Sequence, residues 1–128
     1  MAERKRVEAG LKTTICEFVD DLGIVFSGSS DLLLVKMFFE SMNPESCAQH
    51  VVRHVLPHER HIVARNKSFF IDEKDTIFSG LPKNKIQTYS SILSKGPDEG
   101  GPSTENMEMI WRYFDVMISL AKRCRKNE

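Results

Sequence analysis

The C-terminal segment 103–124 constrains the fold of this chain more than any other part of it. Its apolar residues recur at intervals of three and four, which places them on one face of an α-helix. They are Met107, Ile110, Trp111, Phe114, Met117, Ile118 and Ala121. A helix with this much apolar and aromatic surface must bury it, either in its own core or against a partner.

The same helical spacing recurs along most of the remaining chain. It predicts further helices over residues 3–25, 31–39, 44–56, 58–65, 72–79 and 82–95. Asp31, Asn43 and Asp72 are the expected N-cap residues, and Pro44 suits a first helical position. The segment 32–39 is apolar nearly all round, so we expect it to be buried at the centre beside the C-terminal helix.

A short apolar run, Phe69–Ile71, has the composition of a β-strand. No second convincing strand is present to pair with it, so we expect an extended or turn segment whose rings enter the core. The sequence therefore predicts an all-α domain of five to seven helices, with short connections and no substantial sheet. At 128 residues, with 41% hydrophobic and 28% charged residues, the chain fits one domain with its own core.

Within this single domain, 1–128, three segments stand out. Residues 1–6 form a basic N-terminal end, residues 96–102 form an acidic Gly/Pro-rich loop that we expect to be exposed and mobile, and residues 103–124 form the helix that carries the only tryptophan. Apolar runs are all shorter than the roughly 18 residues of a membrane span, so no membrane insertion is expected. Three scattered cysteines do not suggest a disulfide framework, which favours a reducing, intracellular compartment.

All four histidines fall within residues 50–61, close to a cysteine. Cys47, His50 and His54 would share one helical face, away from the valines expected in the core, and imidazole and thiolate are zinc ligands. Their spacing matches no standard zinc pattern, so no metal or other cofactor is expected. The alternatives are a solvated or partner-facing polar face and a surface that responds to pH. No catalytic motif is recognisable, and we expect a protein that is not an enzyme.

Basic residues cluster at both ends of the chain. Lys122, Arg123, Arg125 and Lys126 follow the last helix, and Arg4–Arg6 lie in the first. Such clusters can bind phosphate backbones, whereas cations at a helix C-terminus also stabilise the helix through its dipole. The formal net charge is zero, and no aromatic residues alternate with the basic ones, so nucleic-acid binding is the less favoured explanation.

Three stretches together resemble a group of small helical proteins encoded by large double-stranded DNA viruses of algae and protists. They are residues 57–70, which end in Phe-Phe, residues 77–82 (Ile-Phe-Ser-Gly-Leu-Pro), and residues 110–121, which begin Ile-Trp-Arg-Tyr-Phe and end Leu-Ala. The shared residues are mostly apolar core positions, so the resemblance implies a common helical fold. It implies no catalytic residues, and it suggests a location in the virion or in the infected-cell cytoplasm.

These observations predict a protein–protein interaction module, most simply a minor virion or assembly component. Its partners would be viral structural or assembly proteins, and an oligomer is possible. The candidate contact residues are Trp111, Tyr113, Val116 and Leu120 on the last helix, together with the histidine-bearing face of residues 44–56. The alternative is a regulator of viral or host gene expression that contacts nucleic acid through the terminal basic clusters.

Overall fold

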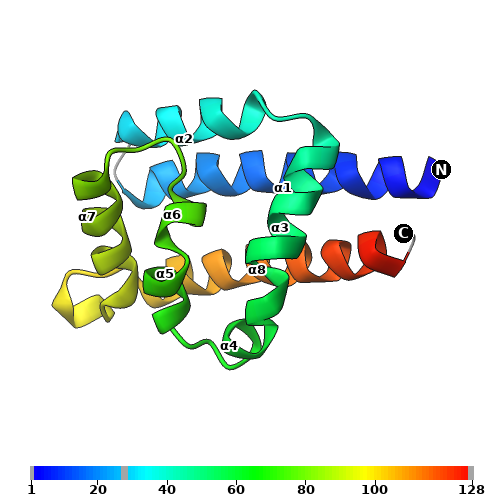
Figure 1. Ribbon diagram of the computed structural model, residues 1–128. Helices are drawn as coiled ribbons and strands as arrows, with labels where there is room; N and C mark the ends of the chain where they lie inside the picture. The colour runs from blue at the N-terminus through cyan, green and yellow to red at the C-terminus, as the bar shows by residue number, and fades with distance from the viewer. Residues whose placement is uncertain (1, 27–28, 127–128) are drawn as a thin grey trace.

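The computed structural model describes residues 2–26 and 29–126, and within these ranges the chain forms helices and no strand (Figure 1). The α-helices are α1 (Ala2–Val25), α2 (Asp31–Glu40), α3 (Pro44–His54), α4 (Glu59–Val63), α5 (Ser68–Asp72), α6 (Lys74–Ile77), α7 (Lys83–Ser94) and α8 (Thr104–Lys126). Two 3₁₀ helices, η1 (Leu56–His58) and η2 (Pro97–Glu99), lie between them. The predicted all-α class is confirmed.

The centre of the molecule is the pair formed by α1 and α8. They lie side by side and run in opposite directions, and α3 crosses both of them (Figure 1). All seven apolar residues that the sequence assigned to one face of the last helix are buried in one continuous core. The prediction that residues 32–39 form a second central helix is wrong, because α2 packs on the opposite side of α1 from α8 and lies at the edge of the fold.

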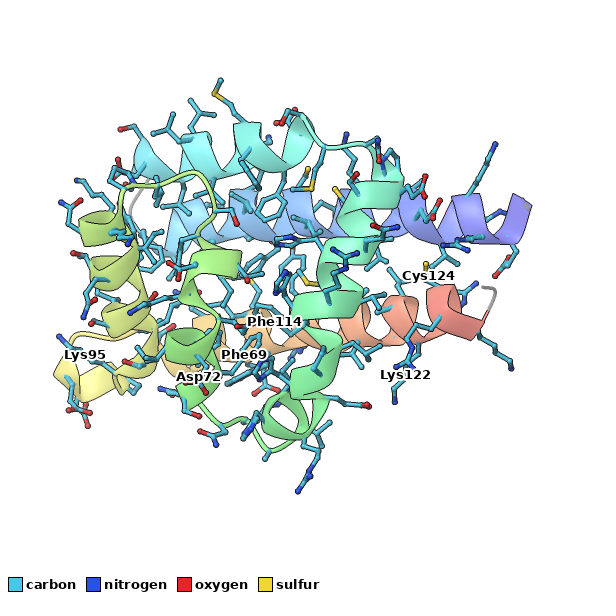
Figure 2. All side chains as sticks on the ribbon, in the orientation of Figure 1. Phe69, Asp72, Lys95, Phe114, Lys122 and Cys124 are labelled. Carbon is cyan, nitrogen blue, oxygen red and sulfur yellow. The ribbon has the colours of Figure 1, made fainter. Side chains whose placement is uncertain are left out.

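Aromatic rings from α5 fill the space above α8. Phe69 and Phe70 are both fully buried, and their ring centroids lie 5.0 Å from that of Phe114 and 4.7 Å from that of Trp111, respectively. Figure 2 labels Phe69 and Phe114, which lie between α5 and α8. Their predicted place in the core is confirmed, and of the extended and turn forms expected for this segment the structure shows a helical turn, α5. The amide of Ser68 donates to the side-chain oxygen of Asn66 at 3.0 Å, which stabilises the start of this turn.

The predicted N-caps differ in their outcome. Asn43 accepts a hydrogen bond from the amide of Ser46 at 2.8 Å and precedes a proline, so this cap is confirmed. Asp31 is instead the first residue of α2, because its carboxylate bonds to α7 rather than to its own helix. Asp72 ends α5, and the following Glu73 occupies the cap position of α6.

The Gly/Pro-rich segment 96–102 is exposed over residues 97–100, as predicted. It is nevertheless ordered into η2, and the amide of Gly101 donates to the carbonyl of Gly96 at 3.0 Å. Pro102 is buried at the end of the segment, which anchors the entry into α8. The predicted mobility of this loop stays a prediction. Across residues 2–26 and 29–126, no helix has the length and apolar content needed to cross a bilayer.

Candidate interaction surface

The side of α2 that points away from α1 carries an apolar surface, which we call the α2 face. It consists of Leu33, Leu34, Met37 and Phe38 on α2, together with the adjacent Ile24 near the end of α1. These side chains are between 38% and 76% exposed, and side chains project outward along this edge of the molecule (Figure 2). The other large apolar side chains exposed in the described ranges, Val63, Ile71 and Val116, lie singly on other helices. The α2 face is therefore a patch, whereas the others are scattered residues of the kind found on most proteins.

The α2 face follows from the composition of its helix. At 100° per residue, Leu32, Val35 and Phe39 lie on one side of α2, and the structure buries all three. The remaining apolar residues lie on the other side, where no second helix covers them. The apolar residues on all sides of this helix are the sequence feature that could have indicated an exposed apolar face. The same pattern is equally typical of a helix buried on every side.

Phe38 is held in place by its neighbours within the monomer. Its ring lies 5.3 Å from that of Phe39 in a T-shaped arrangement. On its other side is Gly80, where an added Cβ would lie 3.2 Å from the Cβ of Phe38 and 3.4 Å from the carbonyl oxygen of Leu34. Gly80 also has φ +97°, a conformation that suits glycine. The α6–α7 connection thus packs closely against this edge of α2.

Charged groups around the α2 face are paired with one another. Lys36 lies 2.8 Å from Asp20 and 3.9 Å from Glu40, and the hydrogen bond to Asp20 raises the pKa of the lysine. Asp31 accepts a hydrogen bond from the hydroxyl of Tyr89 at 2.7 Å and lies 3.3 Å from Lys85. The tyrosine hydrogen bond, followed by the lysine, lowers the pKa of Asp31. The rim is therefore almost neutral.

The contact residues predicted on the last helix are mostly internal. Trp111 is only 5% exposed, and its ring packs at a tilt against that of Phe70, so its assignment as a contact residue is wrong. Tyr113 donates a hydrogen bond to Asp21 on α1, and burial followed by this bond raises the pKa of the tyrosine.

Two further predicted contact residues on α8 differ in exposure. Leu120 is partly buried and packs against the core. Val116, at 46% exposed, remains available on the surface of α8. Helical periodicity did not separate the two because both flank the buried stripe of this helix.

The predicted polar face of α3 is partly buried. Cys47 is fully buried, and burial raises the pKa of its thiol. His50 is largely covered by Phe39 and by α6, whereas His54 is exposed. The prediction that all three face away from the core is wrong for the first two, because α2 and α6 cover that side of the helix. In residues 2–26 and 29–126, no group of three or more His, Cys, Asp or Glu side chains is arranged to hold a metal ion.

Two of the four histidines instead lie beside one carboxylate. The Oε1 atom of Glu73 lies 3.7 Å from Nδ1 of His54 and 3.5 Å from Nε2 of His58. The fourth histidine, His61, has its Nδ1 3.2 Å from the side-chain amide of Asn66. The contacts of His54 and His58 connect α3 and η1 to the junction between α5 and α6, and the contact of His61 connects α4 to the turn before α5, so all three have a structural explanation.

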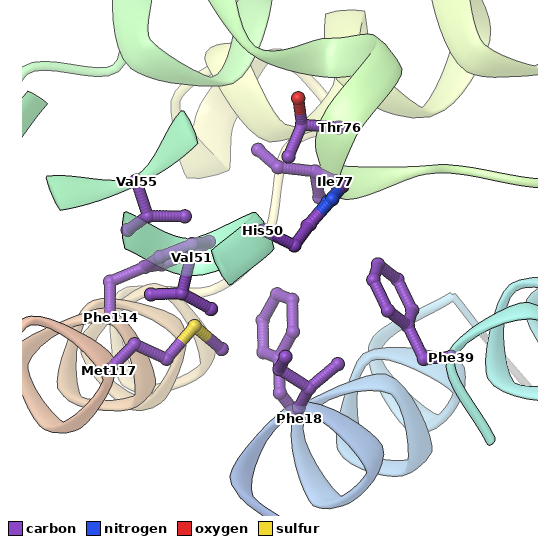
Figure 3. Close-up of a pocket in the computed structure, with 10 residues that line it drawn as sticks. Phe18, Phe39, His50, Val51, Val55, Thr76, Ile77, Phe114 and Met117 are labelled. Carbon is purple, nitrogen blue, oxygen red and sulfur yellow. The ribbon is translucent and has the colours of Figure 1, made fainter. Parts of the chain in front are cut away.

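A small cavity of about 30 Å³ lies where α1, α2, α3, α6 and α8 meet (Figure 3). Its walls are almost entirely apolar, with Phe18, Phe39, Val51 and Met117 among them. A space of this size holds little more than a water molecule, and apolar walls offer a water too few partners. The cavity is therefore a packing defect and not a ligand site.

His50 lies at the edge of this cavity, and its buried Nε2 atom makes no hydrogen bond of normal geometry with any described residue. Burial, then the charge of His54, lowers the pKa of His50, and the backbone of Thr76 partly opposes this. The lowered pKa means that the unfolded state takes up the proton first on acidification. His50 therefore reduces stability as the pH falls through its ordinary pKa of 6.5.

Replacing His50 with leucine is expected to stabilise the protein by about 1 kcal/mol at pH 7, because it removes a buried polar atom without a partner. The advantage over the wild type should widen as the pH falls from about 7 to 5, since the variant lacks the proton-linked loss. Urea unfolding at three pH values measures both effects. Equal stability losses in the two proteins on acidification would contradict this interpretation of His50.

Basic residues from both chain ends meet at one end of the molecule, which we call the basic end. It comprises Arg4, Lys5, Arg6, Lys122, Arg123, Arg125 and Lys126. α1 begins and α8 ends side by side there (Figure 1). Arg123 contacts Glu3 at 2.6 Å. Lys122 forms an ion pair with Glu59. Two of the four cations predicted to bind phosphate are thus already paired with carboxylates.

Among the surfaces of the described residues, the α2 face is the one whose residues are least accounted for by contacts within the monomer. Comparison with known proteins gives no further guide, since no protein-family model, curated protein or solved structure matches this chain.

Proposed function

We propose that this chain is a non-enzymatic protein–protein interaction module that docks through the α2 face, and that it serves as a minor virion or assembly component of a large DNA virus. The observation that carries the interaction role is the exposure of five adjacent large apolar side chains. The viral assignment rests on the sequence resemblance alone.

The α2 face has the properties of a binding surface. Exposed apolar patches of several hundred Å² on soluble proteins commonly mark interaction sites. Phe38 supplies a large aromatic side chain, and its ring already packs edge-on against that of Phe39. The buried half of α2 keeps the helix in place without a partner.

A gene-expression regulator that binds nucleic acid is the second candidate, and the basic end favours it. The fold brings the N-terminal cations next to those of α8. Lys5 and Arg6 lie in the first turns of α1, where the helix dipole disfavours positive charge, so helix stability does not explain them. Arg4, in contrast, forms an ion pair with Glu8 one turn further along the helix. The ion pairs of Lys122 and Arg123 with Glu59 and Glu3 reduce the charge available to phosphate, which leaves this candidate second.

Quantitative mass spectrometry of purified particles against infected-cell lysate tests the proposal. The wild type should be enriched in particles, and a Leu33→Lys/Met37→Lys variant should be depleted from them at equal abundance in the cell. Val116→Lys is the matched control, because it places the same charge on the exposed surface of α8. A wild type that is abundant in the cell and absent from particles would remove the virion role and favour the regulator. Depletion of the control alone would move the contact to α8.

A further inference from the structure

We propose that the occupant of the α2 face is a second copy of this chain, so that two molecules pair through α2 across a two-fold axis. This inference rests on the proposed interaction function and names its partner. A two-fold interface uses the same patch on both molecules, so the patch must be apolar enough, complementary to itself in shape, and free of charge repulsion.

The α2 face is large enough for a dimer. Its five side chains, 38% to 76% exposed, present on the order of 500 Å² of apolar surface, which is at the upper end for a monomer. A standard interface covers about 800 Å² on each partner, of which slightly more than half is non-polar. The α2 face therefore supplies the non-polar part, and the surrounding charged rim supplies the rest.

The surface of α2 has a shape that fits its own copy. Leu33 and Met37 form one ridge four residues apart, and Leu34 and Phe38 form a parallel ridge beside it. Ridges of this spacing on two helices interdigitate in the commonest helix-packing geometry. A two-fold rotation places the ridges of one copy in the groove of the other. No charged residue lies between the two ridges.

The charges around the α2 face favour a copy over other occupants. Lys36 is paired with Asp20 and Glu40, and Asp31 with Lys85, so two rims can approach without strong repulsion. The formal net charge of the chain is zero, which also permits self-association. A lipid surface fits less well, because membrane-binding helices carry an excess of lysine and arginine beside their apolar side. The rim of the α2 face has three carboxylates and two lysines, which are Asp20, Asp31, Glu40, Lys36 and Lys85.

Sedimentation equilibrium of the full chain, from about 1 μM to several hundred μM, tests the dimer, since interfaces of standard size have micromolar or tighter Kd values. The wild type should approach twice its mass of 14.7 kDa. Met37→Lys and Leu33→Lys each place a charge in the interface and should raise the dimer Kd at least 100-fold. Val63→Lys is the matched control: it lies on α4, is 68% exposed, and should dimerise like the wild type.

Circular dichroism checks that each variant remains helical, and all three substitutions are at exposed positions where stability changes are small. A wild type that stays monomeric throughout the range would overturn the dimer, as would a dimer insensitive to both α2 variants. Co-sedimentation with vesicles containing phosphatidylserine, lost in Met37→Lys, would assign the surface to lipid and also overturn it. A monomeric wild type whose entry into particles still requires the α2 face would refute the dimer and leave the interaction function standing.

Discussion

Replacing Phe114 with alanine is expected to lower the free energy of unfolding by about 3–5 kcal/mol, the usual loss for a buried aromatic residue. Phe114 is 2% exposed and lies where three helices meet. Its ring centroid is 5.2 Å from that of Phe18 on α1 and 5.0 Å from that of Phe69 on α5. The alanine variant loses these contacts and leaves a cavity that rigid helices cannot close.

Thermal and urea unfolding of the Phe114→Ala variant measure this loss. The melting temperature should fall by roughly 10–20 °C, given the usual conversion for a domain of this length. Val116→Ala provides the control on the same helix, because that side chain is half exposed and should change stability by less than about 0.5 kcal/mol. A loss below about 1 kcal/mol in Phe114→Ala would show that the aromatic cluster is not the centre of the core.

The helices with one apolar face were predictable from the sequence, since their burial depends on periodicity alone. In α1, Val7, Leu11, Ile15, Phe18 and Leu22 are all buried, as their spacing indicates. The same holds for the stripe of α8. One apolar face requires one direction of burial, so the neighbours of the helix need not be known.

The position of α2 could not be predicted in this way. An all-round apolar helix is compatible with a central place in the core and also with a place at the edge that leaves apolar residues exposed. The choice depends on how many helices pack around it, which is a property of the tertiary arrangement. The candidate site was missed for this reason, because the residues that carry it were assigned to the core.

The sequence of a single helix also does not predict which side chains are buried when segments far away in the chain cover that helix. Cys47 and His50 lie opposite the valines of α3, yet α2 and α6 cover them. Conversely, the sequence makes Trp111 a candidate contact residue, but Phe70 of α5 packs against it and buries it. Both errors arise from contacts between residues that are far apart in the chain, which periodicity within one helix does not reveal.

A second large effect is expected at Gly101, where alanine should cost about 2–3 kcal/mol, the range for steric overpacking. A Cβ at this position would lie 2.1 Å from the carbonyl oxygen and 2.7 Å from the carbonyl carbon of Lys95. These are backbone atoms, so no side-chain rotation relieves the clash. The carbonyl of Lys95 also accepts a hydrogen bond from Lys67 at 3.0 Å, and its displacement would weaken that contact.

A substitution at the neighbouring Gly100 separates the cost of steric crowding from the cost of a left-handed backbone conformation. Its φ is +91°, but an added Cβ would meet nothing within 4 Å. Gly100→Ala should therefore cost only the strain of a left-handed conformation, about 1–2 kcal/mol. Urea unfolding should rank Gly101→Ala as the less stable variant. The reverse order would mean that the turn after η2 yields easily, and that the close approach of residues 95 and 101 does not help to fix the start of α8.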